Sequence, residues 1–233
     1  MLAASAKLTV TTLTTDCYRI LRNAILKLDV VPGTPLIEGQ IASQLGISKT
    51  PVREALARLV GEGLVLTEAG RGSVVAGISE QTIRELYQLR IILESASLRE
   101  VAPDLTSADL DDLIALARAT EDARKRNDQR AFIEANELFH LSLIRKGGNQ
   151  SLIAIVDGIF EQIRRVRIAI YQAAVTHGVA DHVEGNHQAI LEALAARDAE
   201  RAAAIIQSDI HHFLDRIETP VIQAALKHLA STR

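Results

Sequence analysis

Residues 21–75 decide the fold, and they read LRNAILKLDVVPGTPLIEGQIASQLGISKTPVREALARLVGEGLVLTEAGRGSVV. Apolar residues recur with a helical period from Thr15 to Leu28, which predicts a first helix. The segment VPGTPL then brings two prolines and a glycine, and these residues end the helix. The chain therefore opens with a helix that stops at a well-marked turn.

Three further elements follow this turn. A short helix is expected over residues 38–45, and Ser48 precedes a third helix whose first turn holds Pro51, where the missing N–H costs nothing. Two β-prone runs at 64–67 and 73–76 enclose a glycine-rich tip. The order of helix, helix, turn, helix and hairpin predicts a winged helix-turn-helix over residues 1–77.

The remainder of the chain, residues 78–233, has helical periodicity throughout. Ser79 is the expected N-cap of its first helix, and six or seven helices are predicted. No internal repeat is visible, so a compact all-α antiparallel helical bundle is favoured over a solenoid, and the fold class is mainly α. The predicted breaks lie at Pro103/Thr106, 126–128, 147–150, Gly178, Arg197/Asp198 and Pro220.

Composition excludes several classes of protein. With 233 residues, near half of them apolar and a quarter charged, the chain is expected to fold throughout as two domains. A single cysteine, Cys17, excludes an internal disulfide framework and is expected in the core. No apolar run approaches the roughly 20 residues of a bilayer span, and the N-terminal segment is too polar for a secretory signal. A cytoplasmic protein without membrane contact is expected.

The charge is distributed unevenly along the chain. Residues 1–77 hold eight Lys and Arg against six Asp and Glu, a balance of +2 that leaves −5 for the rest of the net −3. The N-terminal domain is therefore the candidate anion-binding part. With no Trp and seven Phe and Tyr in the chain, stacking platforms for single strands are not expected, so double-stranded DNA is the favoured partner.

The third helix is expected to read DNA. In a helix-turn-helix the second helix of the pair enters the major groove with the polar residues of its N-terminal end. Here those residues are Lys49, Thr50 and Arg53, while Arg58, one turn further on, is expected at a phosphate or in solvent. The opposite side of the helix is apolar and holds Val52, Leu56, Leu59 and Val60. The alternative is a basic amphipathic helix that is merely solvated.

The whole stretch 21–75 resembles the winged helix-turn-helix of the GntR family of bacterial regulators. The resemblance implies DNA contacts at Lys49, Thr50 and Arg53, and at Gly70 and Arg71 in the wing, whose flanking glycines allow close approach to DNA. One departure stands out in the second helix. The family often has a DNA-contacting arginine there, and this chain has Gly39. Affinity or operator choice is therefore expected to differ.

The helical region from residue 80 to about 217 resembles the FCD-type ligand-binding domain of the FadR subfamily. The motifs that carry this resemblance are LYQLRIILE at 86–94, NELFH at 136–140 and HQAILEAL at 187–194. It implies homodimeric regulators that answer to small organic acids or related metabolites. It also implies that such bundles often hold a divalent metal.

Four polar residues fall within apolar stripes and are expected to point inward: Asn136, His140, His187 and Asp209. One reading is a shared divalent metal, which suits imidazoles and a carboxylate together, and the other is separate polar residues bonded to nearby backbone. The family pattern places metal ligands at these four positions. The first is usually Asp and the last usually His, so the site is expected to hold a different metal of the zinc, nickel or manganese type, hold it weakly, or be empty.

The remaining polar candidates near the bundle interior are two histidines and several arginines. His212 is a possible substitute ligand, whereas His211 is expected in solvent. Arg90 and Arg167 are expected inside the bundle and suit a ligand carboxylate, although Arg90 has an alternative role as an ion-pair partner of Glu94. Arg164 and Arg165 are expected on the surface.

The function expected from the sequence is a transcription regulator. A homodimer would place two recognition helices on a palindromic operator, and a small carboxylate effector bound in the helical domain would alter that binding, as in a metabolite-responsive repressor. Two other classes stay open. One is a metal-dependent enzyme, and the other is a DNA-binding protein whose bundle only dimerises. The direction of the effector response stays open as well.

Overall fold

A computed structural model describes residues 4–176 and 186–230 of the chain. The chain divides into two compact units, each described here by itself. The first unit takes in residues 1–79 together with 227–233, and the second takes in residues 80–226. Within the described residues no helix is long and apolar enough to cross a membrane.

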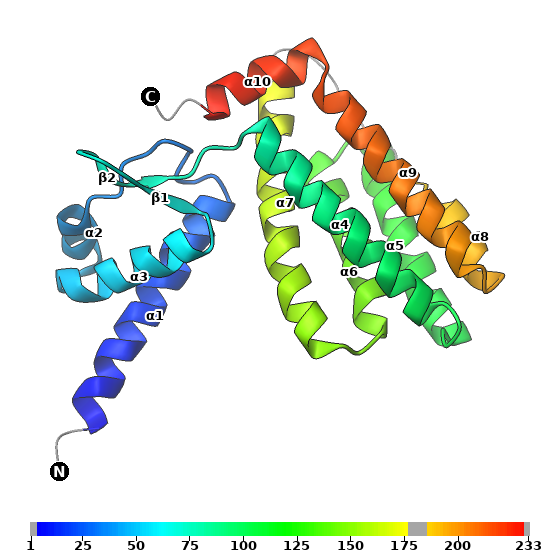
Figure 1. Cartoon of the computed structure of the whole chain (residues 1–233), viewed down its shortest axis with the longest axis horizontal. Coiled ribbons are helices and arrows are strands. Elements are labelled where there is room, and N and C mark those ends of the chain that lie inside the picture. The colour runs from blue at the N-terminus through cyan, green and yellow to red at the C-terminus, as the bar shows by residue number, and fades with distance from the viewer. Residues whose placement is uncertain (1–3, 177–185, 231–233) are drawn as a thin grey trace. The chain divides into compact units, whose positions relative to one another are not determined.

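The first unit has the predicted order of three helices and a hairpin (Figure 1). The hairpin strands pair antiparallel in a register from Val65 opposite Val75 to Glu68 opposite Gly72. The first helix extends further toward the N-terminus than the apolar period predicted, whereas the second and third begin where the sequence placed them. The elements are α1 (Ala4–Leu26), α2 (Glu38–Leu45), α3 (Lys49–Gly61), β1 (Val65–Glu68) and β2 (Gly72–Val75).

One hydrophobic core joins the elements of the first unit. Cys17 is 1% exposed within this core, as predicted. Gly46 ends α2 with a φ of 65°, a backbone conformation that would be strained in a residue with a side chain. Val60, which the sequence placed on the apolar side of this helix, is 38% exposed near the end of α3. Apolar residues of the core include Leu21, Ile25, Leu36, Ile41, Val52, Leu56, Leu59, Leu64 and Val75.

The second unit consists of helices in its described part, and its predicted breaks are confirmed there. Thr106 caps the second of these helices with a full capping box, and Asp128, Asn186 and Asp198 cap later ones. The break predicted around Gly178 lies outside the described residues. The helices are α4 (Glu80–Val101), α5 (Ser107–Lys125), α6 (Gln129–Lys146), α7 (Gln150–Thr176), α8 (His187–Ala195), α9 (Ala199–Ile217) and α10 (Pro220–Ala230).

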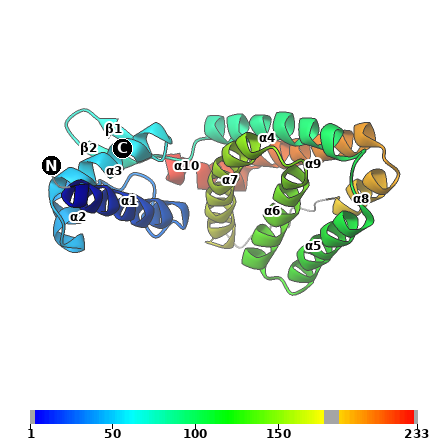
Figure 2. The ribbon, with the colours of Figure 1, turned by 90° about the horizontal axis from the view of Figure 1, so that it is seen from below.

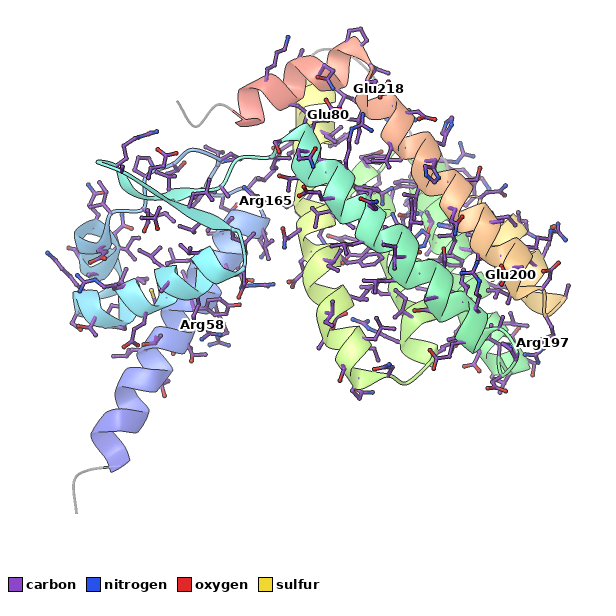
Figure 3. The ribbon with its side chains drawn as sticks, in the orientation of Figure 1. Arg58, Glu80, Arg165, Arg197, Glu200 and Glu218 are labelled. Carbon is purple, nitrogen blue, oxygen red and sulfur yellow. The ribbon has the colours of Figure 1, made fainter. Side chains whose placement is uncertain are left out.

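Neighbouring helices of this unit run antiparallel. Figure 2 shows α4 alongside α9 across one side of α5, α6 and α7. Arg84 bonds Glu218 at 2.9 Å near one end of the α4–α9 pair, and Arg99 bonds Glu200 at the other end. The labelled Glu218 and Glu200 mark these two ends in Figure 3. The predicted antiparallel bundle is therefore confirmed, and its interior lies between these layers.

Candidate nucleic-acid interface and buried polar cluster

The N-terminal end of α3 presents polar side chains to solvent. Lys49, Thr50 and Arg53 are exposed, whereas Pro51 and Val52 between them are buried in the core of the first unit. Ser48 is the N-cap, and its hydroxyl makes no capping hydrogen bond. The first-turn N–H groups of a helix are available to an anion when the cap leaves them free. This end of α3 can therefore meet a phosphate with both backbone and side-chain donors.

Arg53 is held by a residue that the sequence did not single out. Its Nε and one terminal nitrogen donate to the two carboxylate oxygens of Glu38 at 3.0 and 2.8 Å. The bond to Arg53 holds the pKa of Glu38 below its usual value. Glu38 is the first residue of α2 and Arg53 is the fifth residue of α3, so this pair joins the N-terminal parts of the two helices. Nothing in the sequence pattern distinguishes Glu38 from any other acidic residue in a first turn.

Gly39 lies beside the other basic residue of this surface. A Cβ built on Gly39 would lie 3.5 Å from Cε of Lys49, in ordinary contact, so the lysine stem runs along α2 where a side chain is absent. The departure at residue 39 thus leaves Lys49 next to the first turn of α2. The positive charge at this place comes from α3 instead of α2.

The wing carries one further cation. Gly70 and Gly72 adopt φ values of 77° and 75°, which glycine tolerates and other residues rarely adopt. Arg71 between them is exposed, and its NH1 donates to Glu68 at 2.9 Å. The hairpin therefore presents Arg71 at an exposed tip, as the sequence predicted.

Arg58 has a structural contact that the sequence did not indicate. Its guanidinium lies 3.8 Å from the ring centroid of Tyr18 on α1. The hydroxyl of Tyr18 in turn donates to Glu62 at 2.5 Å. Arg58, labelled in Figure 3, therefore helps to join α1 to α3, a role beyond the predicted phosphate or solvent contact.

The interior of the second unit contains a cluster of polar side chains on α4, α6, α7 and α8. Asn136, His140 and His187 are 3%, 4% and 5% exposed, so the prediction that they point inward is confirmed. Asn136 Nδ2 lies 3.0 Å from His187 Nε2, and the two imidazole centroids are 5.4 Å apart. The ring of Phe139 stacks on His187 with centroids 4.1 Å apart.

Glu94 links Arg90 to His140 inside this cluster. Arg90 Nε donates to one carboxylate oxygen, and His140 Nδ1 lies 2.7 Å from the other. Burial is the largest single influence and raises the pKa of Glu94, but Arg90 and His140 together outweigh burial and hold that pKa at about 2. Burial and Arg90 lower the pKa of His140 to about 4, so its imidazole is neutral at pH 7. The ion pair that the sequence offered as the alternative role of Arg90 is therefore present.

Arg167 reaches the cluster from α7. One of its terminal nitrogens donates to Asn136 Oδ1, and its guanidinium carbon lies 5.9 Å from the ring centroid of Phe213. Burial lowers the pKa of Arg167, although the group stays charged at neutral pH. Burial also lowers the pKa of His187, to about 2, and leaves that ring neutral. Arg167 is thus an interior cation with a neutral amide as its acceptor.

Asp209 does not join the imidazoles. Its Oδ2 accepts from the backbone N–H of Asn186 at 2.8 Å, at the start of α8. Burial raises the pKa of Asp209, and the N–H bond partly offsets this. His212 is exposed, and so is His211, whose Nδ1 lies 2.7 Å from the carbonyl of Gln207. Asp209 therefore fixes a helix terminus in this structure.

The cluster as it stands does not fit a divalent cation. Among the described residues no three His, Cys, Asp or Glu side chains are placed to hold a metal ion. Asn136 Oδ1 and His187 Nε2, two of the expected ligand atoms, already have hydrogen-bond partners. Two guanidinium groups, from Arg90 and Arg167, are the adjacent cations and would repel a third one. The metal stays a prediction from family resemblance.

Two arginines near the cluster were assigned to the surface. Arg164 is partly exposed and donates to Glu137 with its Nε at 2.6 Å. Arg165 is only 4% exposed, so its surface assignment was wrong (Figure 3 labels it). Burial lowers the pKa of Arg165 to about 10. Consecutive arginines on a helix point about 100° apart, so one of them can face the interior while the other meets solvent.

A groove of about 670 Å³ lies between α5 and α8 of the second unit. His187 lies at its wall together with Phe132 on α6. The groove therefore reaches the polar cluster from outside. Its other lining side chains include Arg118, Glu121, Arg124, Gln188 and Glu192.

Comparison with known families matches both units. Residues 13–75 match the model of bacterial regulatory proteins of the gntR family, and residues 85–212 match the FCD domain, more than half of the chain. This chain belongs to the GntR family. As a GntR-family protein with an FCD domain, it is a DNA-binding transcription regulator. The narrower FadR subfamily stays a prediction.

Curated relatives of this GntR-family protein are named as regulators. It is 29% identical over 183 residues to the HTH-type transcriptional regulator McbR of Escherichia coli, covering 77% of this chain and 82% of that one. It is 32% identical over 193 residues to the Nta operon transcriptional regulator of Aminobacter aminovorans, covering 80% and 85%. It is 28% identical over 212 residues to the probable D-xylose utilization operon transcriptional repressor of Paenarthrobacter nicotinovorans, covering 91% and 92%.

Solved structures share the fold. A putative GntR transcriptional regulator from Rhodococcus sp. RHA1 superposes with a TM-score of 0.70 at 24% identity, over 88% of this chain and 96% of that one. The McbR structure from E. coli gives 0.68 at 24% identity, over 91% and 98%. At this identity the likeness establishes the arrangement of helices and wing.

Proposed function

We propose that this regulator binds a palindromic operator as a homodimer and acts as a repressor whose affinity changes when its FCD domain takes up a small carboxylate. The observation that carries the DNA-binding part is the exposed start of α3, where Lys49, Thr50 and Arg53 stand beside free first-turn N–H groups. Arg71 at the wing tip supplies a second contact with the backbone or the minor groove.

The effector part of the proposal is supported by the interior of the second unit. Arg90 and Arg167 are guanidinium groups of the kind that binds carboxylates, and Arg90 is already paired with Glu94. We therefore assign the response to a ligand carboxylate and route no step through a metal ion. One DNA-reading unit per chain supports the dimer, because palindromic operators mirror the two-fold symmetry of the protein.

The decisive experiment selects duplex DNA from a random pool at physiological salt. The enriched sequence is then titrated with wild type, with Arg53→Ala and with the control Arg130→Ala, whose exposed side chain pairs with Glu134 in the second unit. We expect a palindrome bound by wild type and by the control with nanomolar affinity, and at least about tenfold more weakly by Arg53→Ala. Failure to enrich any sequence, with or without added carboxylates, contradicts the proposal.

A further inference from the structure

Arg167 is a half-buried cation of the second unit that has no anionic partner among the described residues. It makes no ion pair among the described residues, and its hydrogen bond goes to the neutral amide oxygen of Asn136. Two neighbouring arginines are matched with carboxylates, the buried Arg90 with Glu94 and the partly exposed Arg164 with Glu137. Asp209, the remaining carboxylate of this cluster, is bonded to the backbone at the start of α8. The cluster therefore has one positive charge that is not balanced by a bonded carboxylate.

A second unsatisfied group lies beside it. The hydroxyl of Tyr87 is buried and has no hydrogen-bond partner in the part of the chain that the structure describes, and the whole residue is 1% exposed. Tyr87 and Arg167 contact the same ring, because Phe213 stacks on Tyr87 at a centroid distance of 4.4 Å and lies 5.9 Å from the Arg167 guanidinium carbon. A buried hydroxyl without a partner is uncommon in native proteins and indicates a missing acceptor.

An empty space adjoins Arg167. A cavity of about 20 Å³ is bounded by this arginine and by apolar groups of Phe132, Ile170 and Phe213. A volume of this size holds about one water molecule, or a group of similar size such as a methyl. The walls are mostly apolar, so the short alkyl end of a ligand fits them better than a second charge does.

We propose that the FCD domain of this chain holds a short aliphatic monocarboxylate directly, with its oxygens between the Arg167 guanidinium and the Tyr87 hydroxyl and without a metal ion. One anion supplies the missing partner of the cation and the missing acceptor of the hydroxyl. The inference rests on the proposed carboxylate response and names the two side chains that would bind the carboxylate. It also explains why Asn stands at residue 136, since an aspartate there would itself neutralise Arg167 and compete with the ligand.

The test uses propionate as the probe and the full-length protein in EDTA. Titration calorimetry and the melting temperature are measured with sodium propionate against sodium chloride at equal ionic strength. We expect wild type to bind propionate in EDTA and to melt at higher temperature with it. Arg167→Gln is expected to weaken binding at least about tenfold, because it removes the charge but keeps a donor for Asn136.

Two further variants separate binding from folding. Tyr87→Phe removes only the unpartnered hydroxyl, so the ligand-free melting temperature is expected to hold or rise while propionate affinity falls about threefold or more. Asn136→Asp is expected to abolish propionate binding by pairing with Arg167. The control Arg130→Gln removes an exposed arginine and is expected to leave binding unchanged.

Three outcomes would overturn the inference: binding that requires zinc, nickel or manganese and is lost in EDTA, binding that survives Arg167→Gln and Tyr87→Phe, or no binding under any condition. Operator binding by the same preparations is measured in parallel. A protein that binds its operator but not propionate contradicts this inference alone. A protein that binds propionate but selects no DNA contradicts the proposed function alone.

Discussion

Glu38 restrains Arg53, the arginine that we propose reads DNA. In the free protein Arg53 donates twice to this carboxylate, so part of its charge is neutralised before DNA arrives. Glu38→Gln removes the competing charge and also a repulsion with phosphate. We expect affinity for any duplex to rise about threefold to tenfold at low salt, with a steeper dependence on salt concentration.

Binding isotherms over a salt series measure this effect, and Glu134→Gln, from an exposed pair in the second unit, serves as the control. If Glu38→Gln binds DNA more weakly and with a changed base preference, Glu38 does not act by restraining Arg53. That result would show instead that the carboxylate itself accepts a hydrogen bond from a base such as cytosine.

The two buried imidazoles predict loss of stability in acid. The pKa of His140 is lowered to about 4 and that of His187 to about 2, from 6.5 in the unfolded chain. Between pH 6.5 and 4 the unfolded state therefore binds protons that the folded state does not, so stability is full above pH 6.5 and falls as the pH drops. Two such groups give a slope of up to about 3 kcal/mol per pH unit.

Denaturant unfolding of the second unit in EDTA, at pH values from 4.5 to 7.5, measures this slope. His187→Gln is expected to reduce the slope by about half, because one of the two protonation sites is gone. His211→Gln, which changes an exposed histidine, is the control and is expected to keep the wild-type slope. A slope that is the same in all three proteins would contradict the assignment.

Single residues show where sequence reasoning stops. The inward direction of Asn136, His140 and His187 was predictable, since helical period fixes the face on which a side chain lies. Which group each one bonds was not, because partners come from other helices. Asp209 bonds Asn186 instead of the imidazoles, and Arg165 is buried although the sequence gives it no apolar stripe of its own.

Element boundaries were predictable because capping chemistry is local. Thr106, Asp128 and Asp198 each accept a backbone N–H from the first turn of the following helix, and such residues mark a helix start in the sequence itself. The length of α1 was not predicted, since its N-terminal part, ASAKLTVTTLT, is mostly Ala, Ser and Thr and shows no clear apolar period.

The capping box of α5 gives a test at this scale. Thr106 Oγ1 accepts from the N–H of Asp109 at 3.1 Å, and the Asp109 carboxylate accepts from the N–H of Thr106 at 2.9 Å. Thr106→Ala is expected to destabilise the second unit by about 1 kcal/mol. Ser48→Ala, at an N-cap without a side-chain bond, is expected to leave stability nearly unchanged. Equal losses in urea unfolding would show that the capping bonds contribute nothing here.

At the scale of the molecule, the sequence distinguishes the two units. In the first unit two β-prone runs follow the helices, whereas the second unit has a helical period throughout, interrupted only at turns. The helix-turn-helix order and the helical remainder were both predicted, and the family matches at 13–75 and 85–212 agree with them. The sequence predicted Arg167 as a candidate for binding a carboxylate, but its charge balance could not be predicted, because that balance depends on which carboxylates reach it from other helices.

The proposed homodimer makes a geometric prediction about DNA. Two heads that read half-sites on one face of a duplex require a fixed helical phase between those half-sites, with about 10 base pairs per turn. Inserting 5 base pairs at the centre of the selected palindrome turns one half-site to the opposite face, so affinity is expected to fall at least about tenfold. Inserting 10 base pairs restores the phase and is expected to recover part of that loss. Two results would contradict the paired heads. If both insertions weaken binding equally, the helical phase between the half-sites does not matter. If neither insertion weakens binding, each head binds its half-site alone.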